Sequence, residues 1–418
     1  MIQKPKGTLD VLPENTPIWQ YIESTVRSMC ADFGFSEIRF PVFESTELFV
    51  RGVGDTTDIV QKEMFTFTDR DERSLTLRPE GTAGVARSVI ENGLYNGALP
   101  LSLYYIASCY RCEKPQEGRS REFVQFGIEV LGTKTPAADV TAISIAAELF
   151  RRLGVADKIR LEINSIGCPE CRAVYHAALK DYLKENFETL CPTCKERFGR
   201  NPMRILDCKN EECAQLVKSA PRTLEYLCDP CGEHMESVKA LLDALEIKYI
   251  VNPSIVRGLD YYTKTVFEFV SDSIGAQGTV CGGGRYDGLT ESIGGPALPG
   301  IGFGMGITRL ISVMEKAGVA IPEPRKPKLY IAPMGAAAGI KAACIVSALR
   351  KQGICALTDL AGRSLKAQMK YADKQGAEYV AIIGDNELAE NKVQMRCMAN
   401  SEQTQVELDK VVEFLLGR

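Results

Sequence analysis

The chain has 418 residues, of which 45% are hydrophobic and 25% charged, the balance of an ordinary globular protein with two or three domains. Its formal net charge of −4 excludes a general polycation, so any nucleic-acid binding must come from local basic patches. Only two histidines, His176 and His234, are present, which makes a Ser-His-Asp hydrolase a poor fit. No apolar run approaches the roughly 18 residues of a membrane helix, and the N-terminus lacks a secretory apolar segment, so we expect a cytoplasmic protein.

The first half of the chain has the pattern of a mixed domain of helices and strands. Residues 15–35 predict a helix, because their apolar residues recur at helical spacing. Residues 36–44 predict a strand, and Pro41, which cannot donate to a ladder, favours a sheet edge or a subunit boundary. The later predictions are a long hairpin at 101–131, a helix at 141–154, a strand at 157–167 and further strands within 247–286.

The predicted hairpin carries a strand face of unusual chemistry. Because side chains alternate between the two faces of a strand, one face carries Arg121, Phe123, Gln125, Gly127 and Glu129. The alternate residues from 122 to 130 are largely apolar, which predicts that they contact the core. Gly127 leaves room for a ligand to lie against the sheet.

Fifteen cysteines are many, and in a reducing cytoplasm they more often serve as thiols or metal ligands than as disulfides. Eight of them form the pairs Cys168/Cys171, Cys191/Cys194, Cys208/Cys213 and Cys228/Cys231. The first two pairs follow C-x2-C-x19-C-x2-C, a zinc spacing, and eight cysteines could form two four-cysteine sites of open connectivity. Structural zinc would stabilise a segment with little core; the alternative is a helical insertion with free buried thiols.

Other cysteines and the two histidines are weaker candidates for metal ligands. Cys109 and Cys112 are three apart on a predicted strand, so they point to opposite faces and are not expected to share an ion. His176 and His234 lie in or beside the cysteine-rich region and are lesser candidates.

The C-terminal part of the chain predicts a separate small domain. Prolines between residues 322 and 327 indicate a linker. After it, buried-type strands near 328–334, 353–360 and 377–385 alternate with helical stretches, which predicts an α/β domain.

One predicted helix of this domain, from Ser364 to Gly376, carries a basic stripe. Lys366, Lys370 and Lys374 share one helical face. Such a stripe suits contacts with nucleic-acid phosphates, although a solvated helix face is the plainer interpretation.

Six segments together resemble the signatures of one family. Residues 110–129, "YRCEKPQEGRSREFVQFGIE", resemble the second motif of class II aminoacyl-tRNA synthetases in its histidyl form. The other segments are "GFSEIRFPVFE" (34–44), "LRPEGTAGVAR" (77–87), "RGLDYYTKTVFE" (257–268), "GTVCGGGRYDGL" (278–289) and "GIGFGMGITRL" (300–310). The resemblance begins at "PKGTLDVLP" and covers nearly the whole chain, so the chain is similar to histidyl-tRNA synthetases.

The resemblance implies an α/β (α+β) fold of the class II type. The implied parts are an antiparallel-sheet catalytic core at 1–167 and 236–318, a cysteine-rich insertion at 168–235, a linker at 319–326 and an α/β anticodon-binding domain at 327–418. It also implies ATP-dependent ligation of L-histidine to its tRNA through a histidyl-adenylate, with release of AMP and pyrophosphate. ATP, Mg²⁺, histidine, tRNA and a second copy of the chain in a homodimer are the implied partners, and zinc in the insertion stays an expectation from spacing.

The resemblance also implies roles for single residues. Its catalytic cations are Arg257, Arg111 and Arg309, and its ATP contacts are Arg111, Arg119, Arg121 and Arg309; arginine forks suit phosphate and carboxylate. The implied histidine-binding residues are Glu80, Gly81, Thr82, Gln125, Glu129, Tyr261, Tyr262 and Tyr286. Among these, Glu80, Thr82 and Gln125 would bind the α-ammonium group, and Glu129 and Tyr262 the ring nitrogens.

The sixth segment has glycine at every second position from 300 to 306. In a strand this leaves one face bare, either for a flat base or for close packing against another strand. A helix beginning near Ile307 would direct its N-terminus at phosphate. The segments depart from the usual family pattern at Cys112, Lys114 and Thr308, positions that bear on nucleotide or tRNA contact.

Two other functions are compatible with parts of the pattern. A non-catalytic paralogue, the regulatory subunit of ATP phosphoribosyltransferase, shares the catalytic-domain fold but usually lacks the C-terminal domain and several motif residues. A synthetase for another amino acid is the second, and residues 257–262 and 281–289 argue against it.

Overall fold

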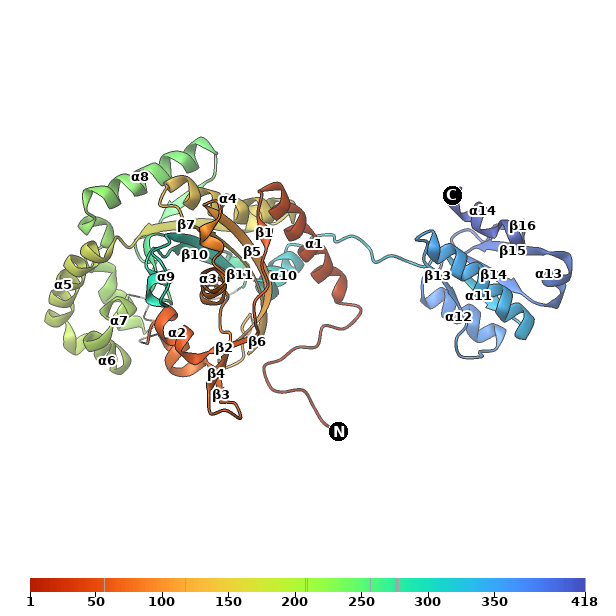
Figure 1. Cartoon of the computed structure of the whole chain (residues 1–418), viewed down its shortest axis with the longest axis horizontal. Helices are drawn as coiled ribbons and strands as arrows, with labels where there is room; N and C mark the ends of the chain where they lie inside the picture. Colours follow the sequence, from red (N-terminus) through yellow and green to blue (C-terminus); the bar gives the residue numbers. More distant parts are fainter. Residues whose placement is uncertain are drawn as a thin grey trace. The chain divides into compact units, whose positions relative to one another are not determined.

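The computed structural model describes the whole chain except residues 56, 117, 207, 209, 256, 275–277 and 418, and the side chain of residue 200. It divides into two compact units, Met1–Ile321 and Pro322–Arg418 (Figure 1). In the described part of the chain, no helix is long and apolar enough to cross a membrane.

The first unit is built on an eight-stranded sheet in the order β1-β5-β6-β11-β10-β9-β7-β8. The strands are β1 (Ser36–Glu37), β5 (Leu101–Tyr110), β6 (Glu122–Leu131), β7 (Arg160–Ser165), β8 (Tyr249–Val251), β9 (Thr263–Val270), β10 (Thr279–Arg285) and β11 (Gly300–Gly306). All neighbours are antiparallel except the two outermost pairs, β1 with β5 and β7 with β8. The predicted class II antiparallel sheet is confirmed.

The predicted hairpin is confirmed as β5 and β6, with Tyr105 opposite Gly127 and Leu103 opposite Glu129. The strand predicted at 36–44 is shorter than expected, because residues 38–42 around Pro41 join no ladder. Its two ends form β1, at the edge of the large sheet, and β2 (Phe43–Ser45), in a small sheet of order β2-β4-β3. The other two strands of that sheet are β3 (Phe65–Thr68) and β4 (Ser74–Leu77).

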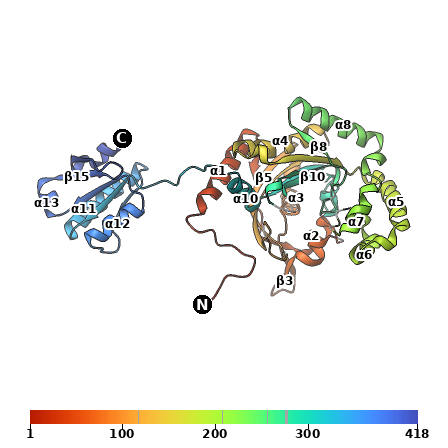
Figure 2. The same cartoon turned by 180° about the vertical axis from the view of Figure 1, so that it is seen from behind.

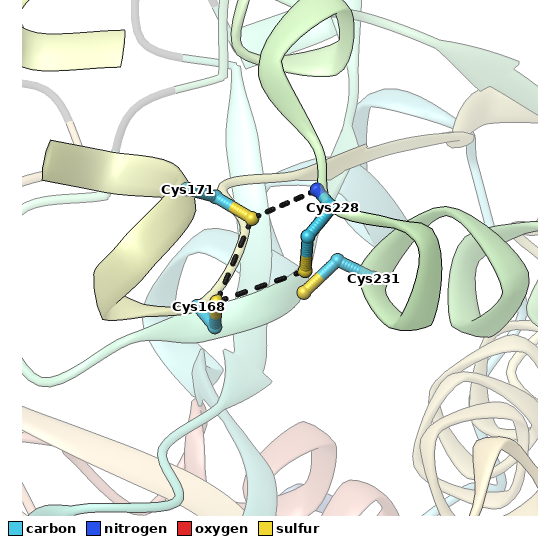
Figure 3. A group of neighbouring side chains, drawn as sticks. All are labelled: Cys168, Cys171, Cys228 and Cys231. Carbon is cyan, nitrogen blue, oxygen red and sulfur yellow. Dashed lines mark hydrogen bonds between the residues drawn. The ribbon is translucent and has the colours of Figure 1, made fainter. Parts of the chain in front are cut away.

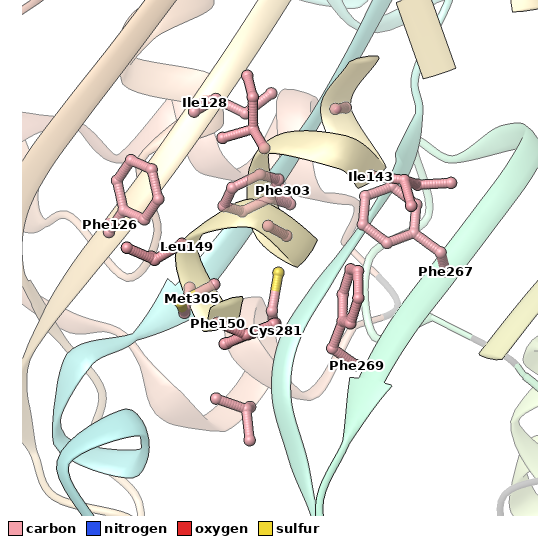
Figure 4. Close-up of a cluster of buried hydrophobic side chains, with 14 of the residues drawn as sticks. Phe126, Ile128, Ile143, Leu149, Phe150, Phe267, Phe269, Cys281, Phe303 and Met305 are labelled. Atoms are coloured by element: carbon pink, nitrogen blue, oxygen red, sulfur yellow. The ribbon is translucent and has the colours of Figure 1, made fainter. Parts of the chain in front are cut away.

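One face of the large sheet is covered by α4 (Pro136–Arg152), with α1 (Thr16–Asp32) and α10 (Ile307–Lys316) beside it (Figure 2). Phe126, Ile128 and Phe303 point from the strands into this layer and are at most 1% exposed (Figure 4). The apolar face predicted for residues 122–130 is therefore confirmed as core at Phe126, Ile128 and Val130, whereas Glu122 and Val124 are half-buried. The other face is partly covered by α3 (Thr82–Glu91), α2 (Thr46–Val53) and α9 (Leu289–Ser292), with a π-helix at Ile59–Glu63 after α2.

A charged network lies inside this otherwise apolar layer. The Asp139 carboxylate, at the first turn of α4, accepts hydrogen bonds from Arg285 of β10 and from the Thr265 hydroxyl of β9 at 2.7 Å. Its Oδ2 lies 2.5 Å from Nε2 of His234. Asp139 and Arg285 are 0% exposed. A buried ion pair of this kind is stable only while each charge keeps its partner.

The insertion is helical in its described residues and lies at the end of the unit remote from α1 and α10. Its helices are α5 (Pro169–Glu185), α6 (Pro192–Arg200), α7 (Glu211–Leu216) and α8 (Asp229–Ala244), with short 3-10 turns at Phe187–Thr189, Pro202–Ile205 (η5), Val217–Ser219 and Thr223–Tyr226. Its apolar core is shared with the catalytic unit, because Tyr175 and Ile205 pack in one cluster with Tyr262 and Val266.

The C-terminal unit is an α/β domain with the sheet order β13-β12-β14-β15-β16. The three predicted strands are confirmed as β12 (Leu329–Pro333), β13 (Ala356–Thr358) and β14 (Tyr379–Ile383), all parallel. Two antiparallel strands that were not predicted, β15 (Lys392–Cys397) and β16 (Gln403–Glu407), extend the sheet. The helices are α11 (Ala336–Lys351), α12 (Leu365–Lys374), α13 (Asp385–Glu390) and α14 (Val411–Leu416), and α12 carries the lysine stripe.

Replacing Asp139 by Ala should strongly destabilise the first unit, because Arg285 would be left charged, buried and without its main partner. We expect a loss of about 3–5 kcal/mol in the free energy of unfolding, measured by urea denaturation. Asp157→Ala, which removes an exposed partner of Lys158, is the matched control and should have a much smaller effect, because exposed ion pairs contribute little to stability. Equal effects of the two substitutions would contradict a structural role for the Asp139 network.

Candidate active site

A cleft of about 680 Å³ opens over β6, β11, β10 and β9. It is closed on one side by the loop that precedes β9, residues 257–262, and on another by the β5–β6 turn. Of the residues implicated by the sequence, those that line the cleft are Glu80, Thr82, Arg111, Arg119, Gln125, Arg257, Tyr261, Tyr262 and Arg309. The structure thus brings together segments that lie up to 229 positions apart, from residue 80 to residue 309.

Four implicated residues do not line the cleft. Glu129 and Tyr286 are buried at 1% exposure, and the Tyr261 and Tyr286 rings lie 5.6 Å apart. Gly81 contributes its backbone N–H, which donates to Gln125 Oε1 at 3.1 Å. Arg121 lies beside the N-terminal segment, where its own N–H donates to the Gly7 carbonyl at 2.7 Å. Strand alternation does not reach Arg121, because β6 begins one residue later.

Three arginines converge on one end of the cleft. Arg309 donates through Nε to the Gly118 carbonyl at 2.9 Å and through Nη1 to the Thr279 carbonyl at 2.6 Å. Arg111 donates to the Pro79 carbonyl at 2.9 Å and lies over the Phe123 ring, while Arg119 pairs with Glu113 at 2.7 Å.

Burial lowers the pKa of Arg309, and the positive charges of Arg119 and Arg111 lower it further. Like charges held this close repel one another in the protein alone. An anion placed between them would relieve the repulsion, so this end of the cleft suits phosphate.

Arg257 approaches the cleft from the opposite side. Its guanidinium donates to Glu268 and lies 5.6 Å from the centre of the Tyr262 ring. A Cβ on Gly282 would lie 2.4 Å from this guanidinium, so only glycine at that position of β10 lets Arg257 lie flat on the sheet.

The amide of Gln125 is oriented by the protein itself. Its Oε1 accepts hydrogen bonds from the Gly81 N–H and the Tyr105 hydroxyl, both at 3.1 Å. These two donors occupy both lone pairs of that oxygen, so the Nε2 amide group is the part of Gln125 left to bind a ligand. A donor suits a carboxylate, which differs from the ammonium contact expected for Gln125.

The Glu80 carboxylate lies at the N-terminus of α3. Its oxygens accept the backbone N–H groups of Thr82 at 2.7 Å and Ala83 at 2.9 Å. Burial raises the pKa of Glu80, while these two hydrogen bonds act in the opposite direction. Each oxygen keeps a further lone pair for a ligand cation.

Glu129 is a buried carboxylate with an unused oxygen. Tyr286 donates its hydroxyl to Oε2, whereas Oε1 is buried without a hydrogen-bond partner. Burial raises the pKa of Glu129 well above its ordinary value, despite the bond from Tyr286. Such a group is poised to accept a hydrogen bond from a polar ligand that reaches it.

The glycines of β11 make room for neighbouring side chains. A Cβ at Gly300 would overlap the Tyr286 ring, one at Gly302 the Glu129 carboxylate, and one at Gly304 the Gln125 amide. Close packing therefore explains most of the glycine row, and only Gly304 and Gly306 reach the cleft. The expected helix start at Ile307 is confirmed by α10.

The space expected beside Gly127 is not open to a ligand. A Cβ on Gly127 would lie 2.3 Å from the Tyr105 ring, which is 1% exposed and lies directly opposite on β5. Tyr105 was not implicated by the sequence, although a tyrosine and a glycine paired across the predicted hairpin were a visible signal. It supports the pocket by orienting Gln125.

The eight insertion cysteines form two groups of four. One joins Cys168 and Cys171 to Cys228 and Cys231 (Figure 3), and the other joins Cys191 and Cys194 to Cys208 and Cys213. Two groups of four match the expectation from the cysteine count, and the structure supplies the connectivity that the spacing left open. The pairing is nested, because the outer pairs lie where the chain leaves and rejoins the catalytic sheet.

The geometry of both groups fits a four-thiolate zinc site. Within each group all sulfurs lie within 4.8 Å of one another, and Cys168–Cys228 and Cys191–Cys208 are 3.9 and 3.8 Å apart. Tetrahedral zinc with Zn–S bonds of about 2.3 Å would place its sulfurs about 3.8 Å apart.

Backbone donors assist one of the sulfurs. Burial opposes ionisation of Cys171, but the N–H groups of Cys228 and Cys168 lower its pKa from 9.0 to about 7. Neither histidine belongs to a group of four: His234 contacts Asp139, and His176 lines a separate cavity.

An antiparallel sheet of this order, with converging arginines over a pocket of buried carboxylates, is the architecture of a class II aminoacyl-tRNA synthetase. The sequence model described as "Histidyl-tRNA synthetase" matches residues 7–190 and 206–310, and that of an "Anticodon binding domain" matches 328–418. The chain belongs to the histidyl-tRNA synthetase family.

Similar proteins support this assignment along the whole chain. A histidine–tRNA ligase of Acetivibrio thermocellus is 55% identical over 99% of both chains, and one of Caldanaerobacter subterraneus is 51% identical over 98% of both. The crystal structure of apo histidyl-tRNA synthetase from S. aureus is similar with a TM-score of 0.85 and 38% identity, covering 99% of this chain and 100% of that one.

Replacing Glu129 by Gln should stabilise the ligand-free chain. The folded-state pKa of Glu129 is raised above its ordinary 4.5, so the folded state binds more protons than the unfolded state above that pH. Wild-type stability therefore falls as pH rises from about 4.5, and Glu129→Gln escapes this loss. We expect the free energy of unfolding of the variant to exceed that of the wild type by about 1 kcal/mol or more at pH 7.5. The difference should vanish near pH 4.5.

The matched control is Glu122→Gln, on the other face of the same strand. It should leave the pH dependence of unfolding unchanged. If Glu129→Gln shows no gain in stability at any pH, burial of the Glu129 carboxylate does not destabilise the fold.

Proposed function

We propose that this chain joins L-histidine to its tRNA in two steps, through a histidyl-adenylate, with release of pyrophosphate and then AMP. The observation that carries the proposal is the cleft itself, in which the positive charges of Arg111 and Arg119 act on Arg309 at one end. The Glu129 carboxylate, with Oε1 free of a hydrogen-bond partner, is buried outside the cleft lining. Such an arrangement matches a polyanion at that end of the cleft and a donor-rich side chain that reaches Glu129.

In the proposed first step, the histidine carboxylate attacks the α-phosphorus of ATP. The attacking group is already ionised, so no histidine base is needed. Arg111 and Arg257 hold the α-phosphate from opposite sides, and Arg309 and Arg119 bind the outer phosphates. Fixed positive charge that meets the charge of the transition state lowers the barrier without reorganisation.

Histidine recognition is proposed to use the polar groups beneath the cleft. Glu80 and Thr82 accept the α-ammonium group, and the Gln125 Nε2 donor contacts the carboxylate. The ring nitrogens bind Glu129 and Tyr262. Tyr286 orients Glu129, and Tyr261 packs against the rings of Tyr262 and Tyr286. A site whose polar groups are satisfied only by the correct side chain rejects others by about 10⁴-fold or more.

ATP is expected to bring Mg²⁺ with it. Each carboxylate among the described residues that line the cleft already has a protein partner: Glu80, Glu113, Glu162 and Glu268. Mg²⁺ commonly keeps several waters and binds substrate phosphates, so we propose that phosphate oxygens and water are its main ligands here. When bound, it would neutralise part of the phosphate charge.

In the second step the tRNA 3′-end accepts the histidyl group, and the α-phosphate takes the proton. The C-terminal unit is proposed to bind the anticodon arm, and Lys366, Lys370 and Lys374 of α12 suit phosphate contacts. The cytoplasmic location expected from the sequence stays a prediction.

The chain is proposed to act as a homodimer through the segment at 34–44. Val42 and Phe43 are 42% and 50% exposed, and Phe43 packs against the 43% exposed Phe67 of the same small sheet. Apolar side chains grouped on a surface in this way mark contacts between proteins. A single-chain mass by light scattering at micromolar concentration would contradict the proposal.

The regulatory-subunit function is less supported, because the arginines and the anticodon-binding domain are all present. The deciding measurement is histidine-dependent exchange of pyrophosphate into ATP. In Arg257→Ala we expect exchange to fall about 10²–10³-fold, because charge stabilisation at the α-phosphate is lost, while the dissociation constant for histidine changes less than about 3-fold.

The control for that experiment is Arg151→Ala, an exposed arginine of α4, which should exchange at the wild-type rate. Absence of exchange in the wild-type chain, together with binding to a phosphoribosyltransferase, would favour the regulatory subunit. Wild-type exchange in Arg257→Ala would remove Arg257 from the proposed role.

Zinc is proposed in both four-cysteine groups as a structural ion. Protein purified without added zinc should contain about two zinc ions per chain, and a strong chelator should lower its melting temperature. Cys194→Ser and Cys231→Ser should each remove about one ion, whereas Cys344→Ser, at an exposed cysteine outside both groups, should remove none. Full stability at zero metal content would contradict the proposal.

A further inference from the structure

The loop at residues 257–262, which carries Arg257, has a second cavity behind it. Arg257 and Tyr262 line the main cleft on one side and a cavity of about 180 Å³ on the other. The far wall of the cavity belongs to the insertion, through α5 and the segment at 201–204. The loop is therefore a partition between the proposed phosphate site and the insertion.

The insertion holds this partition by direct hydrogen bonds. Arg204 donates from Nη2 to the Gly258 carbonyl at 2.7 Å, one residue after Arg257. Asn201 donates from Nδ2 to Asp260 Oδ1 at 3.3 Å. On the catalytic side, the Asp260 N–H donates to the Val53 carbonyl at 3.1 Å. The loop is thus fastened between the end of α2 and the insertion.

The segment that carries Arg204 is itself fixed by a cysteine group. α6 begins just after Cys191 and ends just before Asn201, and Cys208 follows shortly after η5. Ile205, at the end of η5, is 0% exposed in the core shared with Tyr262. The position of the Arg204 guanidinium is therefore set by buried structure on both sides.

Arg257 has two supports: Glu268 of β9 pairs with its guanidinium, and the loop positions its backbone. Arg257 lies outside the β-ladders, its Nε is buried without a hydrogen-bond partner, and its guanidinium must fit the bare surface of Gly282. A shift of the loop by about 1 Å would move the charge away from the reacting phosphate, and misplacement of that size costs about 10²-fold in rate.

We propose that Arg204 is a positioning residue for Arg257, so that the cysteine-rich insertion is part of the amino-acid activation site. This inference rests on the proposed function and deepens it. Arg204 does not touch substrate. It holds the backbone next to Arg257, the residue proposed to bind the α-phosphate.

The test compares Arg204→Ala with Arg204→Lys and with Lys195→Ala, which removes a partly exposed charge from the same insertion. In pyrophosphate exchange we expect Arg204→Ala to lower kcat by about 10–100-fold with KM for histidine within about 3-fold of wild type. Arg204→Lys, which keeps a donor, should recover part of the rate, and Lys195→Ala should match wild type.

A double-mutant comparison separates positioning from general damage. If Arg204 acts through Arg257, Arg204→Ala should cost less than about 3-fold in single-turnover adenylate formation when Arg257 is already Ala. Hydrogen–deuterium exchange should show lost protection at 257–262 and unchanged protection at β5 and β6.

The proposal is overturned if kcat of Arg204→Ala stays within twofold of wild type, or if the losses in the double mutant multiply. Should Arg204→Ala fail to fold, Asn201→Ala, which removes only the bond to Asp260, must show a smaller loss in the same direction. Exchange activity in the wild-type chain tests histidine adenylation independently of Arg204, so a negative result with Arg204 variants refutes only the positioning role.

Discussion

The buried carboxylate of Asp139 is a polar link between helices and strands of the first unit that otherwise meet in a largely apolar core. It connects α4 to β9, β10 and α8 through Thr265, Arg285 and His234. Arg285 immediately precedes Tyr286, whose hydroxyl donates to Glu129. One ion pair therefore fixes the end of β10, and with it the tyrosine that orients the deepest polar group of the pocket.

The pocket above this network is made by pairing large polar side chains with glycines on neighbouring strands. Glu129 lies over Gly302, Gln125 over Gly304, and Arg257 over Gly282. Strand register thus determines where each functional group can lie. A one-residue slip would replace the facing glycine by a residue whose side chain occupies the same space. The same arrangement buries charges that oppose folding, as the raised pKa of Glu129 indicates, and a ligand repays that cost.

Sequence patterns predicted the strands and helices whose hydrophobic residues recur at regular spacing. They failed for residues whose contacts lie far away in the sequence. The alternation at 122–130 identified Phe126 and Ile128 as core, but it was extended one residue too far, to Arg121. Cysteine spacing indicated metal sites but left their connectivity open, because spacing is local and the nested pairing depends on the whole insertion. Asp139 and Arg285 gave no signal, since a buried charge and a surface charge look alike in sequence. The β15–β16 hairpin was missed because only Val393, Met395 and Val406 are buried there, among exposed polar residues.

The nested arrangement of the cysteine groups has a consequence for how the chain folds. β7 and β9 are hydrogen-bonded neighbours, although the whole insertion separates them in sequence. A link from Cys168 and Cys171 to Cys228 and Cys231 would shorten the connection between the two strands and lower its loop-closure cost by about 1 kcal/mol. A metal bound there early would shorten the effective separation of β7 and β9, and lower contact order speeds folding. Metal at the outer cysteine group would then help the catalytic sheet to form as well as stabilise the insertion.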